Sequence, residues 1–140
     1  MAFEGKHSNI TEKIIGAFYK VYNQLGHGFS EKVYENAFVF ELKREALEVV
    51  QQAAIKVFYE DILIGEFFAD LLVNQVVMIE IKAVQQLSVE HEAQLMNYLK
   101  ATNVEIGLLL NFGPKAQYKR KIFDNDRKGS MNWTKRLNKL

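Results

Sequence analysis

The sequence predicts an α/β fold in which a sheet of strands is covered by helices. Apolar residues recur at helical spacing in three segments, and four other segments read as apolar strands. The predicted order is α, α, β, β, β, α, β, with a further edge strand as a candidate last element. With 49% hydrophobic and 25% charged side chains among 140 residues, the chain is expected to form one domain with a real core over residues 1–140.

Capping residues and glycine place the three predicted helices. Asn9 and Glu12 have the spacing of a capping box, and the first helix is then expected to run to Gly26. Ser30 is a good N-cap for the second helix, and Ser88 for the third. The side chains expected on the buried faces of these helices include Ile14, Phe18, Val21, Tyr34, Phe38, Leu95 and Leu99.

The strands follow from apolar runs bounded by turn residues. Residues 49–59 and 62–72 predict the first two strands, joined by a turn at residues 60–61. Residues 76–83 predict the third strand, and residues 104–111 a buried strand that ends before Gly113 and Pro114. Residues 117–123 are the candidate edge strand.

Three charged residues interrupt the most apolar part of the sequence, and their burial would be costly without partners. Asp70 lies in the second strand, while Glu80 and Lys82 lie two residues apart in the third and therefore share a face. A three-residue loop between these strands pairs residue 73 with residue 77 and places Asp70 opposite Glu80. A two-residue loop would instead pair Asp70 with Ile79 on the apolar face, so burial favours the first register.

Two carboxylates held together beside a lysine suit one chemistry well. Mg²⁺ is bound by one or two carboxylates while its other positions are left to water and phosphate. Such a metal lowers the pKa of a bound water, and a lysine can position or polarise the nucleophile. The alternative interpretation is a solvated strand face that carries a Glu80–Lys82 ion pair.

The motifs around this hairpin resemble a known family. Asp70 followed by Glu80-Ile81-Lys82 resembles the core of the PD-(D/E)XK nuclease superfamily, with Ala69 where the superfamily name has proline. Residues 28–34 read G-x-x-E-x-x-Y, which is similar to the signature of the GxxExxY family of small bacterial and archaeal domains in that superfamily. Residues 94–98 read Q-x-x-x-Y, a motif of its exonuclease branch. The resemblance covers residues 10–112.

The resemblance implies a restriction-endonuclease-like core, with a mixed central sheet flanked by helices, and a metal-dependent nuclease that uses Mg²⁺ or Mn²⁺. It implies that Asp70, Glu80 and Glu31 hold the metal and that Lys82 acts on the nucleophile. The full catalytic set that it implies is Glu31, Asp70, Glu80, Lys82, Gln94 and Tyr98, and His91 is carried over with them for contact with nucleic acid.

Each helical residue in this set has a simpler interpretation. Glu31 lies in the first turn of its predicted helix, where a carboxylate is favoured by the helix dipole. Gln94 and Tyr98 are spaced as an ordinary i, i+4 helix pair, and His91 lies on the exposed flank of the same helix. Without the resemblance, these interpretations would be preferred.

Charge is distributed unevenly along the chain. Residues 115–140 carry nine Lys or Arg against two Asp, a balance of +7, whereas the preceding residues balance to −6. A basic segment of this kind favours an anionic partner such as nucleic acid. The residues singled out for this contact are Lys119, Arg120, Lys121 and Trp133, the last because its ring can stack on a base. An ordinary solvated terminal segment is the alternative.

Two function classes remain open at this point. The first is a metal-dependent nuclease whose expected substrate is DNA, with a protein partner as one source of specificity. The second is a catalytically inactive nuclease fold that acts as a nucleic-acid-binding or protein-interaction module. The chain has no cysteine, no apolar run long enough to span a bilayer and no signal-peptide pattern, so a cytoplasmic protein without membrane contact is expected.

Overall fold

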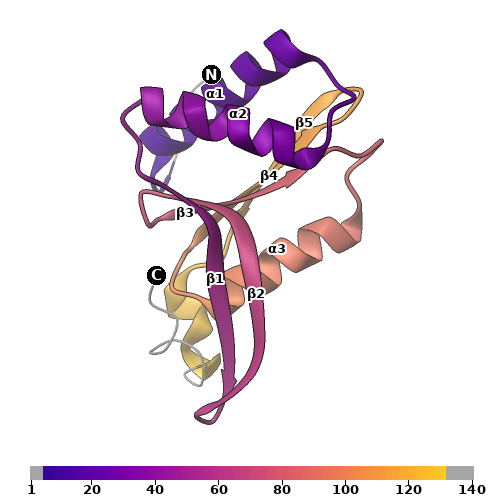
Figure 1. Cartoon of the computed structure of the whole chain (residues 1–140). Coiled ribbons are helices and arrows are strands. Elements are labelled where there is room, and N and C mark those ends of the chain that lie inside the picture. Colours follow the sequence, from indigo (N-terminus) through magenta and orange to yellow (C-terminus); the bar gives the residue numbers. More distant parts are fainter. Residues whose placement is uncertain (1–4, 132–140) are drawn as a thin grey trace.

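A computed structural model describes residues 5–131 of the chain (Figure 1). Its elements follow the predicted order, and the edge strand is present as the eighth element. They are α1 (Ser8–Leu25), α2 (Glu31–Arg44), β1 (Val49–Tyr59), β2 (Ile62–Val73), β3 (Val77–Lys82), α3 (Val89–Ala101), β4 (Ile106–Phe112), β5 (Ala116–Ile122) and a 3₁₀ helix (Asn125–Met131).

The five strands form one mixed sheet in the order β1-β2-β3-β4-β5. Strands β3 and β4 are parallel, because α3 forms the crossover between them, and every other neighbouring pair is antiparallel. Helices α1 and α2 cover one face of the sheet and α3 covers the other (Figure 1). The predicted α/β fold with a mixed sheet between helices is therefore confirmed.

Alternation along β3 divides the core into two layers. Val77, Ile79 and Ile81 pack with α1 and α2, whereas Met78 packs with α3. Glu80 follows the same alternation and points to the α3 side of the sheet. The acidic residue thus lies on the face that is covered by a single helix.

The predicted helix starts are only partly correct. Helix α1 begins at Ser8 after His7, which has a left-handed backbone, and no side chain caps it, so the capping box at Asn9 is wrong. Thr11 instead donates its hydroxyl to the His7 carbonyl oxygen, at 3.1 Å. Ser30 is the N-cap residue of α2 but makes no capping hydrogen bond. Ser88 caps α3 as predicted.

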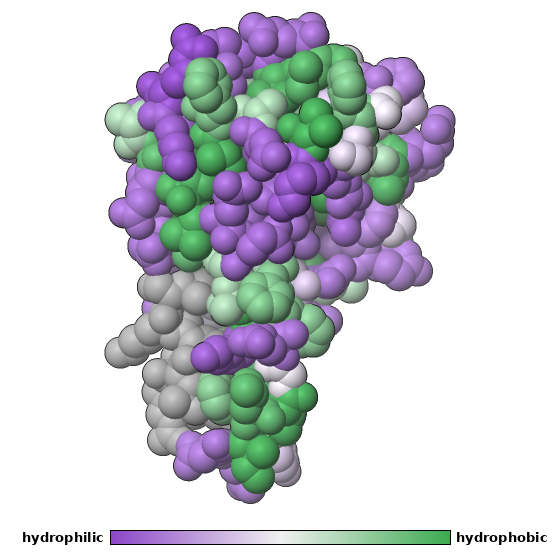
Figure 2. Space-filling view, in the orientation of Figure 1, coloured by the Kyte–Doolittle hydropathy of each residue, from purple (hydrophilic) through white to green (hydrophobic). Residues whose placement is uncertain are grey.

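The β1–β2 hairpin extends well beyond the rest of the sheet (Figure 1). Only residues 71–73 of β2 pair with β3, so the remainder of the hairpin forms a two-stranded arm. Apolar side chains are exposed near its tip, among them Tyr59, Ile62 and Ile64 (Figure 2). The point where this arm leaves the sheet is also the place where Asp70 lies.

No helix in residues 5–131 is long and apolar enough to cross a membrane.

Candidate active site

The regular alternation of side chains between the two faces of the β1–β2 hairpin is interrupted at Gln52 and Asp70. Leu72 and Ala69 lie three positions apart on β2, yet both pack in the layer under α3, so regular alternation is interrupted between them. On β1 the opposing residue, Gln52, has a left-handed backbone with φ of 54°. The pairing register is the same on both sides of this point, with Gln51 opposite Leu71 and Ala53 opposite Ala69. The irregularity therefore changes which face of the sheet the side chains beyond this point occupy, and it does so without inserting a residue into either strand.

Asp70 and Glu80 are joined across β2 and β3 by their own side chains. The Asp70 N–H donates to Glu80 Oε2 at 2.8 Å, and the Ile81 N–H donates to Asp70 Oδ2 at 2.7 Å. These bonds replace the sheet ladder beyond the Leu71–Ile79 pair. The structure has the register favoured by burial, in which Val73 pairs with Val77.

Burial makes this pair of carboxyls difficult to ionise. Glu80 is only 6% exposed, and its burial, reinforced by the negative charge of Asp70, raises its pKa from 4.5 to about 8. Burial also raises the pKa of Asp70, an effect that the Ile81 N–H opposes. The two groups repel each other when both are charged, which a bound cation would relieve.

Lys82 is the last residue of β3 and supplies a positive charge to the site. Its charge lowers the pKa of both Asp70 and Glu80, although burial has the larger effect on each. Its side chain is half-buried. Asp70, Glu80 and Lys82 thus lie close enough to interact, as the hairpin pattern predicts.

Helix α2 approaches the same site with two acidic residues. Glu31, at its first turn, is exposed, and its negative charge contributes to the raised pKa of Glu80. Glu35, one turn later, is 4% exposed and was not singled out by the sequence. Its carboxylate accepts hydrogen bonds from Gln51 Nε2 at 2.8 Å and Gln52 Nε2 at 3.3 Å. The i, i+4 spacing from Glu31 is the one sequence signal that could have identified Glu35.

Gln52 connects this second acidic residue to the site. Its side-chain amide hydrogen-bonds Asp70 and lowers the pKa of that carboxyl, while Glu35 raises it through its charge. One amide therefore lies between two carboxylates that would otherwise repel each other. The left-handed backbone of Gln52 is what turns its side chain to this position.

Helix α3 contributes Gln94 and Tyr98 from the other side. Gln94 Nε2 donates to the Tyr98 hydroxyl at 2.7 Å. Burial raises the pKa of Tyr98, and the charges of Glu80 and Asp70 add to that effect. Gln94 and Tyr98 are thus hydrogen-bonded as an ordinary i, i+4 helix pair. The negative charges of Asp70 and Glu80 act on the Tyr98 hydroxyl and help to raise its pKa.

His91 has a structural role at the start of α3. Its Nδ1 accepts a hydrogen bond from the Ser88 N–H at 3.0 Å, and its own N–H donates to Ser88 Oγ at 3.3 Å. These two bonds form the capping box of the helix. Contact of His91 with nucleic acid stays a prediction.

The basic residues of β5 do not share a face. Lys119 pairs with Leu109 of the α3 layer, whereas Arg120 pairs with Leu108 of the opposite layer. Lys121 forms an ion pair with Glu92 of α3, and Arg120 Nη2 donates to the Lys6 carbonyl oxygen at 3.1 Å. Only Lys119 and Lys121 therefore lie on the site's side of the sheet. Trp133 lies outside the described residues.

Tyr34, the last residue of the G-x-x-E-x-x-Y motif, is fully buried and holds the loop before α2. Its hydroxyl donates to the Gly26 carbonyl oxygen at 2.6 Å and accepts from the Phe29 N–H at 3.2 Å. Its ring stacks on Phe112 of β4, with 4.5 Å between the centroids. The tyrosine thus fixes the segment that leads into Glu31.

This arrangement predicts the effect of removing one oxygen. Tyr34→Phe keeps the stacked ring but leaves two backbone groups without their partner, so the free energy of unfolding should fall by about 1–3 kcal/mol. Urea denaturation followed by circular dichroism measures it. Tyr19→Phe, at a partly exposed tyrosine, is the control and should change stability by less than about 0.5 kcal/mol. Equal losses in the two variants would show that the Tyr34 hydroxyl does not hold the loop.

The donor set suits a metal that keeps most of its water. Within residues 5–131, no group of three or more His, Cys, Asp or Glu side chains has the geometry of a preformed metal site. Asp70 and Glu80 nevertheless lie together as a hard, oxygen-only pair, which is the number of carboxylates that Mg²⁺ takes when water and phosphate complete its shell. The residues present therefore fit Mg²⁺ or Mn²⁺.

Comparison with known proteins identifies the family. No curated protein and no solved structure matches the chain significantly. A family model described as the PD-(D/E)XK nuclease superfamily matches residues 8–122, which is most of the chain and includes Glu31, Asp70, Glu80 and Lys82. The chain therefore belongs to the PD-(D/E)XK nuclease superfamily.

Proposed function

We propose that this protein is a nuclease that hydrolyses phosphodiester bonds with Mg²⁺ or Mn²⁺, and that its substrate is DNA. The observation that carries the proposal is the Asp70–Glu80 pair, two acidic side chains bound to each other's strands in a site that disfavours their charge. Membership of a nuclease superfamily supports the reaction class. A decayed site would have no need to keep this pair together with Lys82.

Each residue of the site then has a proposed task. Asp70 and Glu80 hold the metal, with Glu31 next to them at the start of α2. When bound, the metal supplies a Lewis acid for the phosphate and lowers the pKa of a coordinated water. The Lys82 ammonium donates a hydrogen bond to the attacking water or to a phosphate oxygen. In either case it helps to keep the water in line with the scissile bond. The water gives up a proton to bulk solvent as its oxygen bonds to phosphorus, the ester P–O bond breaks, and the leaving oxygen takes up a proton from solvent.

The remaining residues are proposed to bind and orient the nucleic acid. Gln94 and Tyr98 lie on the α3 side of the site, where the Tyr98 hydroxyl feels both carboxylates. Lys119 and Lys121 are on the same side and offer positive charge to the phosphate backbone. Arg120, His91 and Trp133 are retained as weaker proposals for nucleic-acid contact, and a protein partner remains a proposed source of specificity.

Metal binding provides a direct test of this site. In wild type, Mn²⁺ or Mg²⁺ at about 100-fold above its dissociation constant should stabilise the native state by about 2.7 kcal/mol and raise the thermal midpoint by about 5–10 °C. Asp70→Asn should remove most of that rise, because one of the two ligands has lost its charge. Differential scanning fluorimetry with a metal titration measures both.

The matched control is Glu66→Gln, an exposed carboxylate on the same strand as Asp70. It should show the full metal-dependent rise. An equal rise in wild type and Asp70→Asn would remove Asp70 from the metal site. Stabilisation by metal without cleavage of any nucleic acid would favour the inactive binding module.

A further inference from the structure

A hollow beyond the end of β3 has no task in the reaction described above. It has a volume of about 250 Å³. Three loops line it: residues 27–29 before α2, residues 83–85 after β3, and residues 112–114 after β4. Lys82 directly precedes the second loop, and Glu31 follows the first loop by two residues. The lining loops are therefore directly linked in sequence to residues that are proposed to act on the phosphate.

The wall formed by Val84 is fixed by a buried asparagine. Asn111 is fully buried, its Oδ1 accepts from the Val84 N–H at 3.0 Å, and its Nδ2 donates to the Val84 carbonyl oxygen at 3.0 Å. Gly113 packs directly against the same segment, since a Cβ there would lie 2.0 Å from the Val84 oxygen. Any larger residue at position 113 would displace this wall.

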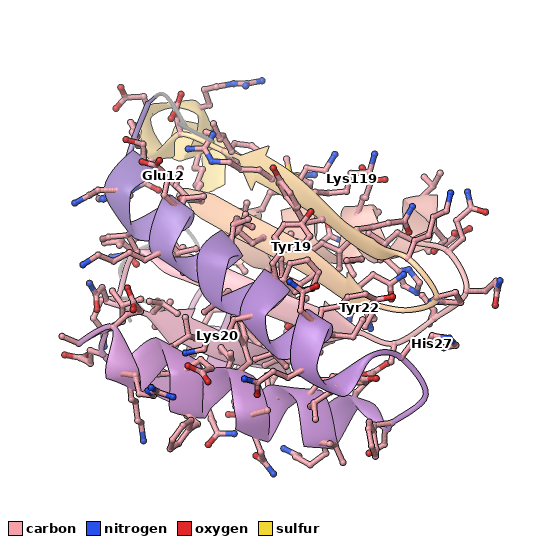
Figure 3. All side chains as sticks on the ribbon, turned by 90° about the horizontal axis from the view of Figure 1, so that it is seen from above. Glu12, Tyr19, Lys20, Tyr22, His27 and Lys119 are labelled. Atoms are coloured by element: carbon pink, nitrogen blue, oxygen red, sulfur yellow. The ribbon has the colours of Figure 1, made fainter. Side chains whose placement is uncertain are left out.

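Two tyrosines fix the other walls in the same way. Tyr34 bonds the backbone of Gly26 and Phe29. The Tyr22 hydroxyl lies 2.8 Å from the carbonyl oxygens of both Gly113 and Pro114, and its single proton is shared between these two acceptors. Tyr22 and His27 lie toward the same end of the α1–α2 layer (Figure 3). Each of the three loops is thus held by a side chain that reaches it from a helix or from the sheet, which makes the pocket preformed.

The chemistry of the lining favours an uncharged ligand that has an aromatic ring and a polar edge. No Asp, Glu, Lys or Arg is among the lining residues, so neither a phosphate nor a charged peptide side chain is matched. Phe29 is 50% exposed and offers a ring for stacking, and Gln85 and His27 offer donors and acceptors to a polar edge. An aromatic ring with a polar edge is the description of a nucleobase.

We propose that this pocket, the Phe29 pocket, takes one unpaired base of the nucleic acid whose phosphate lies at the metal site. The proposal rests on the proposed nuclease function. A base within a duplex is stacked and paired, so entry requires a single strand or an extruded nucleotide. The substrate class favoured by the site is therefore single-stranded nucleic acid, or a strand with an unpaired nucleotide.

The pocket also gives each position of the G-x-x-E-x-x-Y motif a distinct task. Gly28, with φ of 119°, has a backbone that other residues rarely adopt and lines the pocket. The negative charge of Glu31 acts on Glu80 and contributes to its raised pKa. Tyr34 holds the loop between them, so the motif couples a base subsite to the metal site.

Binding without metal tests this proposal apart from catalysis. Fluorescence anisotropy is measured in EDTA with a labelled single-stranded oligonucleotide of about 12 nucleotides, with the matching duplex, and with strands that carry one abasic position. Wild type should bind the single strand more tightly than the duplex, and one abasic position should weaken binding about 10-fold. Phe29→Ala should weaken binding of the intact strand about 10-fold and bind the abasic strand no worse than wild type does.

Phe40→Ala is the matched control, because Phe40 is an exposed phenylalanine on α2 that does not line the pocket. It should bind every probe as wild type does. Gln85→Ala is a second variant that keeps the test valid if Phe29→Ala fails to fold by circular dichroism, and it should weaken binding of the intact strand about 3-fold.

The pocket proposal is overturned if both folded variants bind the intact strand like wild type, if no abasic position matters, or if duplex and single strand bind equally. Base-dependent binding without any metal-dependent cleavage would leave the pocket standing and refute the nuclease. Metal-dependent cleavage that is insensitive to Phe29→Ala and to abasic positions would support the nuclease and refute the pocket.

Discussion

Lys82→Ala should abolish metal-dependent cleavage of single- and double-stranded DNA while binding of DNA weakens by less than about 3-fold. The lysine ends β3 next to two carboxylates, and its charge acts on both of them. If it positions the attacking water or the phosphate, its loss removes an interaction that is strongest in the transition state, so turnover falls by a factor of about 100 or more. Single-turnover cleavage and anisotropy, measured on the same preparation, separate the two effects.

Two comparisons make this expectation specific. Lys43→Ala removes an exposed lysine at the far end of α2 and should leave cleavage and binding unchanged. The double substitution Lys119→Ala and Lys121→Ala should instead weaken binding and flatten its dependence on salt, because phosphate contacts release counterions. Full cleavage activity in purified Lys82→Ala would show that Lys82 is not catalytic or that the activity comes from a contaminant.

The register of the hairpin could be predicted because burial leaves one acceptable answer. Val73 and Val77 pair across a three-residue loop, and any one-residue slip would move Asp70 to the face occupied by Ile79. The same alternation rule places Glu80 on the α3 side. Local apolar pattern and turn length were therefore sufficient to bring the two carboxylates together.

The sequence gives no signal for Gln52, and for Glu35 only the i, i+4 spacing from Glu31, for two different physical reasons. The left-handed backbone of Gln52 occurs at a non-glycine residue inside an ordinary strand pattern, and it depends on tertiary bonds to Glu35 and Asp70. Glu35 lies in a helix whose apolar pattern gives no reason to bury a carboxylate. The contacts of both residues with the site form only when α2 packs against the hairpin.

The edge strand illustrates how a charge cluster in sequence can separate in space. Lys119, Arg120 and Lys121 read as one dense basic patch, but consecutive residues of a strand point to opposite faces. Arg120 accordingly bonds the segment before α1, while Lys121 bonds α3. A run of basic residues in a sequence can therefore be interpreted as one surface patch only after the secondary structure of that segment is known.

Glu80→Gln should make the metal-free protein more stable than wild type at alkaline pH. The folded-state pKa of Glu80 is about 8 against 4.5 for the free side chain, so the native state binds more protons than the unfolded state between these values. The free energy of unfolding of wild type must then fall as pH rises through that window. Glutamine cannot ionise and keeps an oxygen that accepts from the Asp70 N–H, so the variant escapes this loss.

The difference between the two proteins should be small near pH 4 and grow to the order of 5 kcal/mol at pH 9, measured by urea denaturation in EDTA. Glu66→Gln, at an exposed carboxylate, should follow wild type throughout. Adding Mg²⁺ or Mn²⁺ at pH 9 should narrow the difference, because the metal binds the charged pair of wild type and stabilises its native state. A stability difference that does not change with pH would mean that Glu80 does not have a raised pKa in the native state. A metal response that survives in Glu80→Gln would mean that the cation does not bind the charged carboxylate of Glu80.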